Sequence, residues 1–177
     1  MPRFDNSSIR RQDRLLGEES ALELLRRSEY GILAMAACSD ASSGTDPNVA
    51  QDNAGGYCVP MSYAWDGGDH IYFHCAPEGE KLRHLARSGD VCFCVVGATQ
   101  VLPSKFSTLY ESVLVFGRID EIRDPAAKMA ALGLLLDKYS PADKPAGFKY
   151  SEKSLYRTKI LRLAISRISG KSKKFMP

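Results

Sequence analysis

Apolar and polar residues follow two different rhythms along this chain, one typical of strands and the other typical of helices. Runs that are continuously apolar or alternate in steps of two occupy residues 30–37, 57–65, 70–74, 91–96, 108–122 and 159–168. Apolar residues spaced three or four apart occupy residues 18–27, 80–87 and 125–139. The pattern therefore predicts an α+β protein with short strands and inserted helices.

Turn residues between these segments predict how the strands are connected. Asp-Gly-Gly-Asp at residues 66–69 is a strong tight-turn signal and predicts a hairpin between the strands on either side. Pro60 cannot donate to a strand ladder, so the strand at residues 57–65 must bulge or lie at a sheet edge there. Because most connections are of the hairpin kind, we expect an antiparallel sheet that closes as a small barrel.

The remaining segments show little periodicity. Residues 1–17 are polar and basic and are predicted to form an arm, and residues 140–158 a polar connector. Residues 39–56 are rich in Ser, Asp, Asn, Gly and Ala and are much longer than a normal hairpin connection, so we expect a mobile insertion. One domain at residues 18–171 and a basic tail at residues 172–177 complete the expected organisation.

Composition and charge limit the classes of function. With 44% hydrophobic and 25% charged residues, the 177-residue chain resembles an ordinary globular domain. The net charge is +3, yet residues 149–177 carry nine Lys and Arg against the single acid Glu152. These cations could meet an anionic ligand or nucleic acid, but no aromatic-rich recognition motif accompanies them, which favours a solvated strand edge and terminus.

Cysteines and apolar runs suggest the compartment. Five cysteines, an odd number that lies mostly within apolar runs, fit a reducing cytoplasm. The sequence has neither a standard export signal nor about 18 consecutive apolar residues, so we expect no contact with the membrane.

The junction at residues 74–81 is the first candidate site. There a strand gives way to a helix within about one turn, and backbone N–H groups at a helix N-terminus favour a bound anion such as phosphate. Lys81 lies in the first turn and His74 ends the strand, so a cation, backbone donors and an imidazole could meet one ligand. Alternatively, Glu78 and Glu80 complement the helix dipole, and Lys81 is then a solvated surface residue.

Several other chemistries have no sequence support. His70 and His74 would share a strand face but lie about 13 Å apart, too far to chelate one ion. Cys92 and Cys94 share a face in the same way, but no paired Cys or His has zinc-site spacing, so no metal site is expected. Motifs for a nucleophile elbow, a dinucleotide fingerprint and a phosphate loop are missing.

Five segments taken together resemble a known family. They are EYGILAM (29–35), VPMSYAW (59–65), IYFHCAPEGEKL (71–82), VCFCVVG (91–97) and FSTLYESVLVFGR (106–118). In this order and spacing they resemble the nitroimidazole-resistance (Nim-type) branch of the pyridoxamine 5'-phosphate oxidase-like, flavin-binding split-barrel proteins. The resemblance covers most of residues 18–171.

The resemblance implies a homodimer with one FMN in each of two clefts at the subunit interface. Lys81 matches a phosphate-binding lysine, and His74, Cys75 and Ala76 match the strand end beside the flavin. The strand whose backbone lies along the flavin ring corresponds to Val59, Pro60, Met61 and Ser62. Tyr110 and Ser112 match positions that reach the flavin from the partner subunit.

The chain also departs from the family. The insertion at residues 39–56 precedes the presumed ring-contacting strand, where it would cover or reshape the cleft. The arginine-rich motifs of true pyridoxamine phosphate oxidases are missing, which argues against that substrate. We therefore expect a flavin-dependent reductase of small organic compounds, possibly nitroaromatic ones, with His74 orienting or protonating the substrate. The alternatives are a non-enzymatic flavin carrier or sensor, and a haem protein with His74 as axial ligand.

Overall fold

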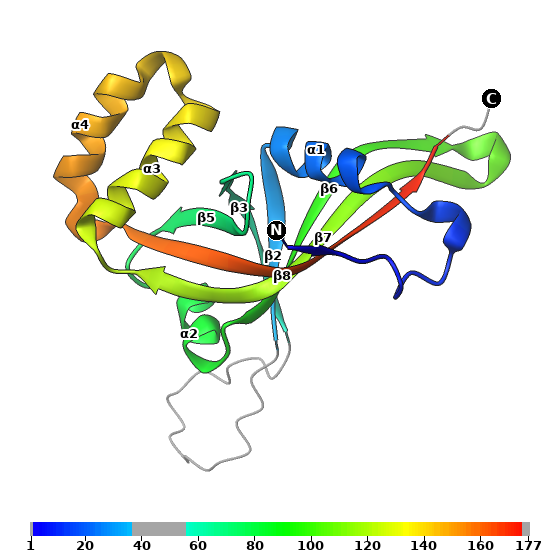
Figure 1. Cartoon of the computed structure of the whole chain (residues 1–177), viewed down its shortest axis with the longest axis horizontal. Helices are drawn as coiled ribbons and strands as arrows, with labels where there is room; N and C mark the ends of the chain where they lie inside the picture. Colours follow the sequence, from blue (N-terminus) through cyan, green and yellow to red (C-terminus); the bar gives the residue numbers. More distant parts are fainter. Residues whose placement is uncertain (1, 37–55, 175–177) are drawn as a thin grey trace, which may run out of the picture.

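A single curled sheet forms the centre of the molecule (Figure 1). The computed structural model describes residues 2–36 and 56–174, so the predicted insertion at 39–56 lies outside the described residues except for Gly56. The strands run in the order β3-β2-β6-β7-β8-β5-β4, and β1 pairs separately with β8. Their bounds are β1 Arg3–Phe4, β2 Tyr30–Met35, β3 Tyr57–Ser62, β4 Ala64–Trp65, β5 His70–Cys75, β6 Asp90–Leu102, β7 Ser107–Ile122 and β8 Lys159–Lys173.

All neighbours along the main path of the sheet are antiparallel, whereas β1 runs parallel to β8. The sheet curls so far that β3, at one end of the strand order, comes into contact with β5 near the other end. The predicted α+β class and antiparallel barrel-like sheet are therefore confirmed, with the sheet curled into a half-barrel.

Four α-helices flank the sheet in the described part of the chain: α1 Glu18–Arg27, α2 Glu80–Arg87, α3 Pro125–Tyr139 and α4 Lys144–Ser154. Figure 1 shows α1 along one side of the sheet, α2 on the other, and α3 and α4 as a helical hairpin at one end. The first three coincide with the predicted helices. The start of α3 follows from its sequence, because the Asp124 carboxylate accepts a hydrogen bond from the Ala127 N–H (2.7 Å) and Pro125 occupies the first turn.

The main core lies between α1 and the concave face of the sheet. The buried faces of the strands contribute alternating residues, while α1 contributes Ala21, Leu24 and Leu25, all fully buried. Rings of Tyr63 and Phe73 meet Phe93 edge-on, with centroids 4.9 and 5.1 Å apart. These contacts fix the curl of the sheet, since they join strands from both ends of the strand order.

Two predictions about local structure need correction. The segment at residues 57–65 is two strands, because Tyr63 and Ala64 are both buried and break the alternation. Only two-residue β4 forms the predicted hairpin with β5, whereas β3 pairs with β2. The expected polar connector at 140–158 contains α4, which packs against α3 where Gly147 lets Leu136 approach closely.

Residues 2–17 follow the edge of β8 that β5 leaves open. The Asp5 N–H donates to the Ile168 carbonyl (2.8 Å), and the Leu16 N–H donates to the Gly170 carbonyl (3.0 Å). The predicted arm thus lies against its own sheet, and Leu16 enters the core with 2% of its surface exposed.

Candidate flavin and substrate site

The candidate site begins at β3, an edge strand among those the structure describes. Pro60 pairs opposite Ile32, and the β2–β3 ladder shows no register shift, so the proline is accommodated at an edge and not by a bulge. Met61 points into the core and Val59 is half-buried, while Pro60 and Ser62 are exposed on the other face. A planar ligand could therefore approach the backbone of β3 from its open edge.

A hollow of about 290 Å³ separates the sheet from the α3–α4 hairpin. Ser62 and His74 line it on the sheet side. The helical side consists of Leu132, Leu135, Leu136, Tyr139, Ser140, Tyr150, Ser151, Ser154 and Thr158. The hollow therefore has apolar walls with a few polar groups that converge on it, as ligand sites commonly have.

Tyr139 fixes the helical wall to the sheet. Its hydroxyl accepts a hydrogen bond from the Tyr63 N–H (2.8 Å) and lies within donating distance of the Tyr63 carbonyl (2.9 Å). The same hydroxyl contacts the Glu29 carbonyl. Because these partners belong to the β3–β4 junction and the start of β2, Tyr139 holds the end of α3 directly beside Ser62.

His74 and Lys81 influence each other electrostatically. Partial burial of the imidazole against the surrounding walls, and then the positive charge of Lys81, lower the pKa of His74 below its ordinary value. The imidazole is therefore neutral at pH 7, with one ring nitrogen able to donate and the other able to accept a hydrogen bond. Lys81 thus lies near His74 at the strand-to-helix junction but does not line the hollow, so a ligand shared by the two side chains stays a prediction.

The start of α2 exposes backbone donors. The residue before the helix is Gly79, whose φ of +139° favours glycine, and among the described residues no side chain caps the first turn. Lys81 is half-buried there. Glu80 points instead toward His84, with 4.0 Å between its Oε1 atom and the histidine Nε2 atom. This arrangement favours the anion-binding interpretation of the junction over the one in which acids complement the helix dipole.

His84, one turn further along α2, has a structural role. It is 7% exposed, and its ring stacks on Tyr57 with centroids 5.2 Å apart. Its Nδ1 atom lies 3.4 Å from the Ala36 carbonyl oxygen. His84 therefore holds α2 against the adjoining ends of β2 and β3.

Cys75 and Ala76 complete the end of β5. Burial raises the pKa of the Cys75 thiol, although Lys81 and Lys159 oppose the shift, so the side chain is a protonated thiol at neutral pH. Ala76 is exposed in the turn that leads to α2. Neither residue offers a reactive group of its own in this state.

Tyr110 and Ser112 lie apart from this hollow. Both belong to β7, where they pair with Lys173 and Lys171 of β8. They line other depressions, and neither contributes to the hollow at His74 within one chain. That these two residues contact the flavin of a second subunit stays a prediction.

The helical wall of the hollow is what sequence reasoning missed. Tyr150, Ser151 and Ser154 come from α4, whose segment contains Pro145 and Gly147 and lacks a strong apolar stripe. A usable signal was Asp143 before Lys144-Pro145, since an acid followed by an early proline is a helix-start pattern.

Other kinds of site find no support in the described residues. Within residues 2–36 and 56–174, no three His, Cys, Asp or Glu side chains gather as metal ligands. The helices described there are all too short or too polar to cross a membrane.

Comparison with known proteins extends these observations. The sequence profile of the family described as pyridoxamine 5'-phosphate oxidase matches residues 17–172, which is most of the chain. No curated protein matches the chain at a significant level.

Solved structures resemble the whole fold. A protein described as a 5-nitroimidazole antibiotic resistance protein from Bacteroides thetaiotaomicron shares 18% identity, covering 90% of this chain and 86% of its own, with a TM-score of 0.66. An FAD- and haem-binding protein from Mycobacterium smegmatis shares 22% identity over 93% of this chain and 75% of its own, with a TM-score of 0.68. An FAD-binding protein from Mesorhizobium loti shares 21% identity over 91% of this chain and 98% of its own, with a TM-score of 0.58. At these identities the likeness establishes the fold.

Proposed function

This chain belongs to the pyridoxamine 5'-phosphate oxidase family, and from that premise we propose that it binds FMN and acts as a flavin-dependent reductase of small organic compounds, nitro compounds among them. The observation that carries the proposal is the junction of β5 and α2, where α2 starts without a side-chain cap and Lys81 lies near enough to lower the pKa of His74. The relatives described as binding FAD or conferring nitroimidazole resistance add support from similar folds.

The residues present fit the phosphate of a flavin mononucleotide. The N-terminus of α2 offers free backbone donors and the favourable end of the helix dipole, and Lys81 adds a positive charge. Glu80, the acid that could occupy this end, lies toward His84. The site therefore offers one concentrated group of phosphate-binding donors.

The ring system would lie along β3. The strand leaves its outer edge open, where Val59, Pro60, Met61 and Ser62 present their backbone, and only Pro60 and Ser62 add exposed side chains. When bound, the flavin supplies the electron transfer, while the protein supplies binding, orientation and exclusion of water. His74 acts in its neutral form at pH 7, by a hydrogen bond that orients the ligand, and the apolar wall from α3 keeps water out of the hollow.

A homodimer is part of the proposal. The convex face of the sheet carries two apolar rows that cross β2, β6 and β7, formed by Ile32, Cys94 and Leu114 and by Ala34, Cys92 and Phe116. We refer to these six residues as the apolar face. A second copy would cover such a surface and bring its own Tyr110 and Ser112 to the flavin.

The proposal is tested first by the visible spectrum of the purified protein. We expect the visible absorption bands of an oxidised flavin, and release of FMN on denaturation. Chromatography of the released compound would identify it. Release of FAD would contradict the choice of FMN, and a Soret band would favour haem with His74 as ligand. Failure of the apo-protein to bind added FMN would contradict the proposal as a whole.

Turnover then separates an enzyme from a carrier. The flavin-loaded protein is mixed with a nitroaromatic compound and a reduced nicotinamide, and oxidation of the nicotinamide is followed by absorbance. We expect catalytic consumption that exceeds one equivalent per flavin. Reduction of the bound flavin without turnover would instead support the carrier or sensor.

A further inference from the structure

The two ends of the described chain meet at one place on the surface. Arg10, Arg11 and Arg14 of the N-terminal segment lie beside Lys171 and Lys173 of β8. The hydrogen bonds between residues 5–16 and residues 168–170 hold the segment there, so the cations are brought together by the fold itself. The sequence shows these cations only as two separate basic stretches.

These five cations line a groove of about 720 Å³ next to the tip of the β6–β7 hairpin. The hairpin contributes Val101, Leu102, Pro103, Phe106, Ser107, Thr108 and Tyr110. A neighbouring depression of about 330 Å³ shares Arg10, Arg11 and Lys171 and extends the positive region along β7. We refer to the larger space as the basic groove.

The charge in the basic groove is poorly balanced. Arg11 and Arg14 share the carboxylate of Asp13, at 2.7 and 3.1 Å, which leaves the charge of one of the two uncompensated. In the described part of the chain, the hydrogen bond of the Lys173 ammonium goes to the neutral hydroxyl of Ser107. Within the described part of the chain, the groove-lining residues include no acid. Like charges held this close repel each other, so a bound anion would relieve the repulsion.

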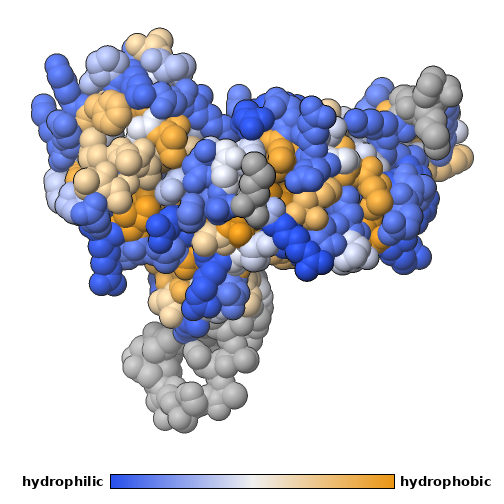
Figure 2. Space-filling model, viewed as in Figure 1, coloured by the Kyte–Doolittle hydropathy of each residue, from blue (hydrophilic) through white to orange (hydrophobic). Residues whose placement is uncertain are grey.

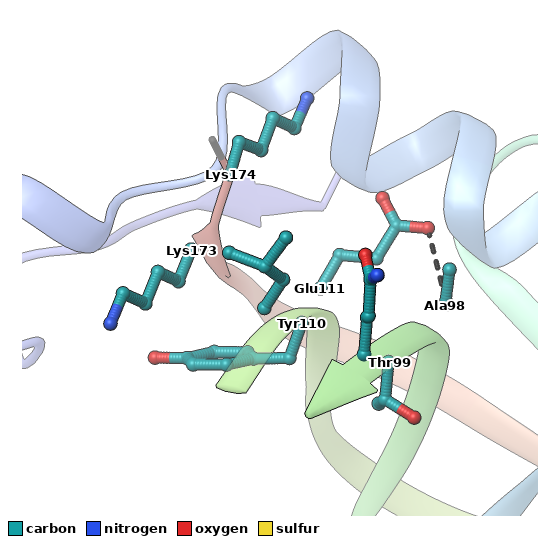
Figure 3. Close-up of a pocket in the computed structure, with 8 residues that line it drawn as sticks. Ala98, Thr99, Tyr110, Glu111, Lys173 and Lys174 are labelled. Atoms are coloured by element: carbon teal, nitrogen blue, oxygen red, sulfur yellow. Dashed lines mark hydrogen bonds between the residues drawn. The ribbon is translucent and has the colours of Figure 1, made fainter. Parts of the chain in front are cut away.

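Aromatic rings lie among the cations. The Lys171 ammonium is 5.8 Å from the centre of the Tyr110 ring, and Phe106 is 98% exposed at the tip of the hairpin. Figure 3 shows Tyr110 and Lys173 projecting to the same side, whereas Lys174 points away from them. Cations next to exposed aromatic faces suit a ligand that carries both phosphates and a flat base.

We infer that the basic groove binds the polyphosphate of a nucleotide, with the exposed ring of Phe106 against the base. The volume exceeds what a single phosphate fills, and five cations exceed the charge of one phosphate. The groove shares no lining residue with the hollow at His74, and Lys81 does not line it. Tyr110 lines the groove and is also proposed to reach the flavin of a second subunit, so in a dimer the groove would adjoin that flavin, and the competition test below distinguishes the two sites.

The test measures binding of ADP, pyrophosphate and adenosine to the FMN-saturated protein by calorimetry at low ionic strength. We expect ADP and pyrophosphate to bind and adenosine to bind far more weakly. The double variant Arg10→Gln, Lys171→Gln should weaken ADP binding roughly a hundredfold, because each lost charge-assisted contact corresponds to about tenfold. Rising salt should weaken binding of ADP to the unsubstituted protein.

Lys174→Gln is the control for a single substitution, since it removes one positive charge three residues from Lys171 but outside the basic groove. It should change ADP affinity by less than about twofold. Unchanged FMN binding and circular dichroism would show that the double variant is folded.

Three outcomes would overturn the inference. The first is equal ADP affinity in the double variant and the unsubstituted protein. The second is competition between ADP and FMN, which would place ADP in the flavin site. This outcome differs from a failure of the proposed function, because FMN would still bind. The third is tighter binding of single-stranded oligothymidylate than of ADP, lost in the same double variant, which would assign the basic groove to nucleic acid.

Discussion

Lys81 and His74 are the two side chains on which the proposed site depends most. Lys81 is half-buried at an uncapped helix start and lowers the pKa of His74 through its charge. The positive charge of Lys81 disfavours protonation of the His74 imidazole. A bound phosphate would neutralise Lys81 and thereby raise the pKa of His74 toward its ordinary value.

Replacement of Lys81 by alanine tests the phosphate contact. A charge-assisted hydrogen bond contributes about 1.5–3 kcal/mol, so FMN affinity should fall roughly ten- to a hundredfold. The free energy of unfolding of the apo-protein should change little. Fluorescence quenching during titration with FMN gives the affinity.

The control for this experiment follows from the structure. His84 is one turn from Lys81 but is buried against Tyr57, so its removal would disturb α2 itself. Arg83 is exposed on the same helix, and Arg83→Ala should leave FMN affinity nearly unchanged. Equal affinity of Lys81→Ala and the unsubstituted protein would mean that Lys81 is a solvated surface residue.

Lys138 is a second residue with an unusual environment. Its ammonium lies 3.7 Å from the centre of the Tyr63 ring, and its Nζ atom is buried with no hydrogen-bond partner among the described residues. Burial lowers the pKa of Lys138 to about 8, although Glu29 opposes the shift. Desolvation therefore outweighs the attraction to the ring and to the carboxylate.

This shift predicts how stability depends on pH. Between about 8 and the ordinary value of 10.5, the unfolded chain binds more protons at Lys138 than the folded chain does, so stability rises with pH in this range. Burial raises the pKa values of Tyr63 and Tyr139, and these groups oppose the rise at the alkaline end. The informative range is therefore pH 7 to about 9.5.

Lys138→Met should remove the effect. At pH 7 the apo-protein should gain about 1 kcal/mol in its free energy of unfolding, a value reduced to allow for the partial exposure of the side chain. Its stability should also rise less between pH 7 and 9.5. Urea unfolding at several pH values measures both, with exposed Lys153→Met as the control. A loss of stability at pH 7 would show that the contact with the Tyr63 ring dominates.

At the scale of elements, the long ladder between β7 and β8 contains one irregularity. The register shifts between Phe116 and Gly117, and a Cβ atom at Gly117 would overlap the carbonyl group of Ala164. Glycine thus permits the close approach that lets the two strands bend while they remain paired. The bend is part of the curl that brings β3 back to β5.

Gly117→Ala should therefore destabilise the fold. We expect a loss of about 2–3 kcal/mol, because the overlapping group belongs to the backbone and cannot rotate away. The melting temperature should fall by roughly 4–12 °C for a chain of this size. Gly17→Ala, where a Cβ atom has open space, should change stability by less than about 0.5 kcal/mol. Equal melting temperatures would show that the ladder can shift to accept a side chain.

Elements with strong local signals were predictable from the sequence. The helices α1, α2 and α3 begin and end as expected, because acids or proline mark their starts and their apolar stripes face the sheet. The pairing of β3 was not predictable in the same way. It depends on Tyr63, which lies between β3 and β4 and whose hydroxyl donates to the Leu25 carbonyl of α1 (2.5 Å). This long-range contact accompanies the change of partner from β2 to β5, and no local pattern reveals it.

The candidate site was predictable only where it lies on contiguous sequence. His74 and Lys81 are seven residues apart, so a strand followed by a helix brings them together. Tyr139 and Ser151 reach the same hollow from a helical hairpin, and their positions depend on long-range packing of α4 on α3. Such packing follows from the tertiary fold and leaves no periodic trace in the sequence.

At the scale of the whole molecule, the proposed homodimer depends on the apolar face. Figure 2 shows apolar residues gathered over the sheet and over the α3–α4 hairpin on the side in view. Ile32 of the apolar face is 36% exposed, and Val96, two residues beyond Cys94 on β6, is 50% exposed. Apolar residues grouped in this way on a sheet favour association with a second copy.

Leu114→Arg should disrupt that association. A charge within the apolar face would have to be buried without a partner in the dimer, which costs on the order of several kcal/mol. Light scattering at micromolar concentration should show a dimer for the unsubstituted protein and a monomer for the variant. Tyr156→Arg, at a residue 85% exposed on a different element, should remain dimeric. A monomeric unsubstituted protein would rule out clefts shared between subunits.

The central position of β8 has a consequence for how the protein is made. β5 ends at Cys75 and needs β8, which begins at Lys159, about 80 residues later in the chain. At about 5–20 residues per second, a ribosome needs roughly 4 to 16 s to supply that partner strand. During those seconds Ile71 and Phe73 have no completed sheet to enter. The apolar face of β5 therefore stays uncovered on the nascent chain until translation has passed β8.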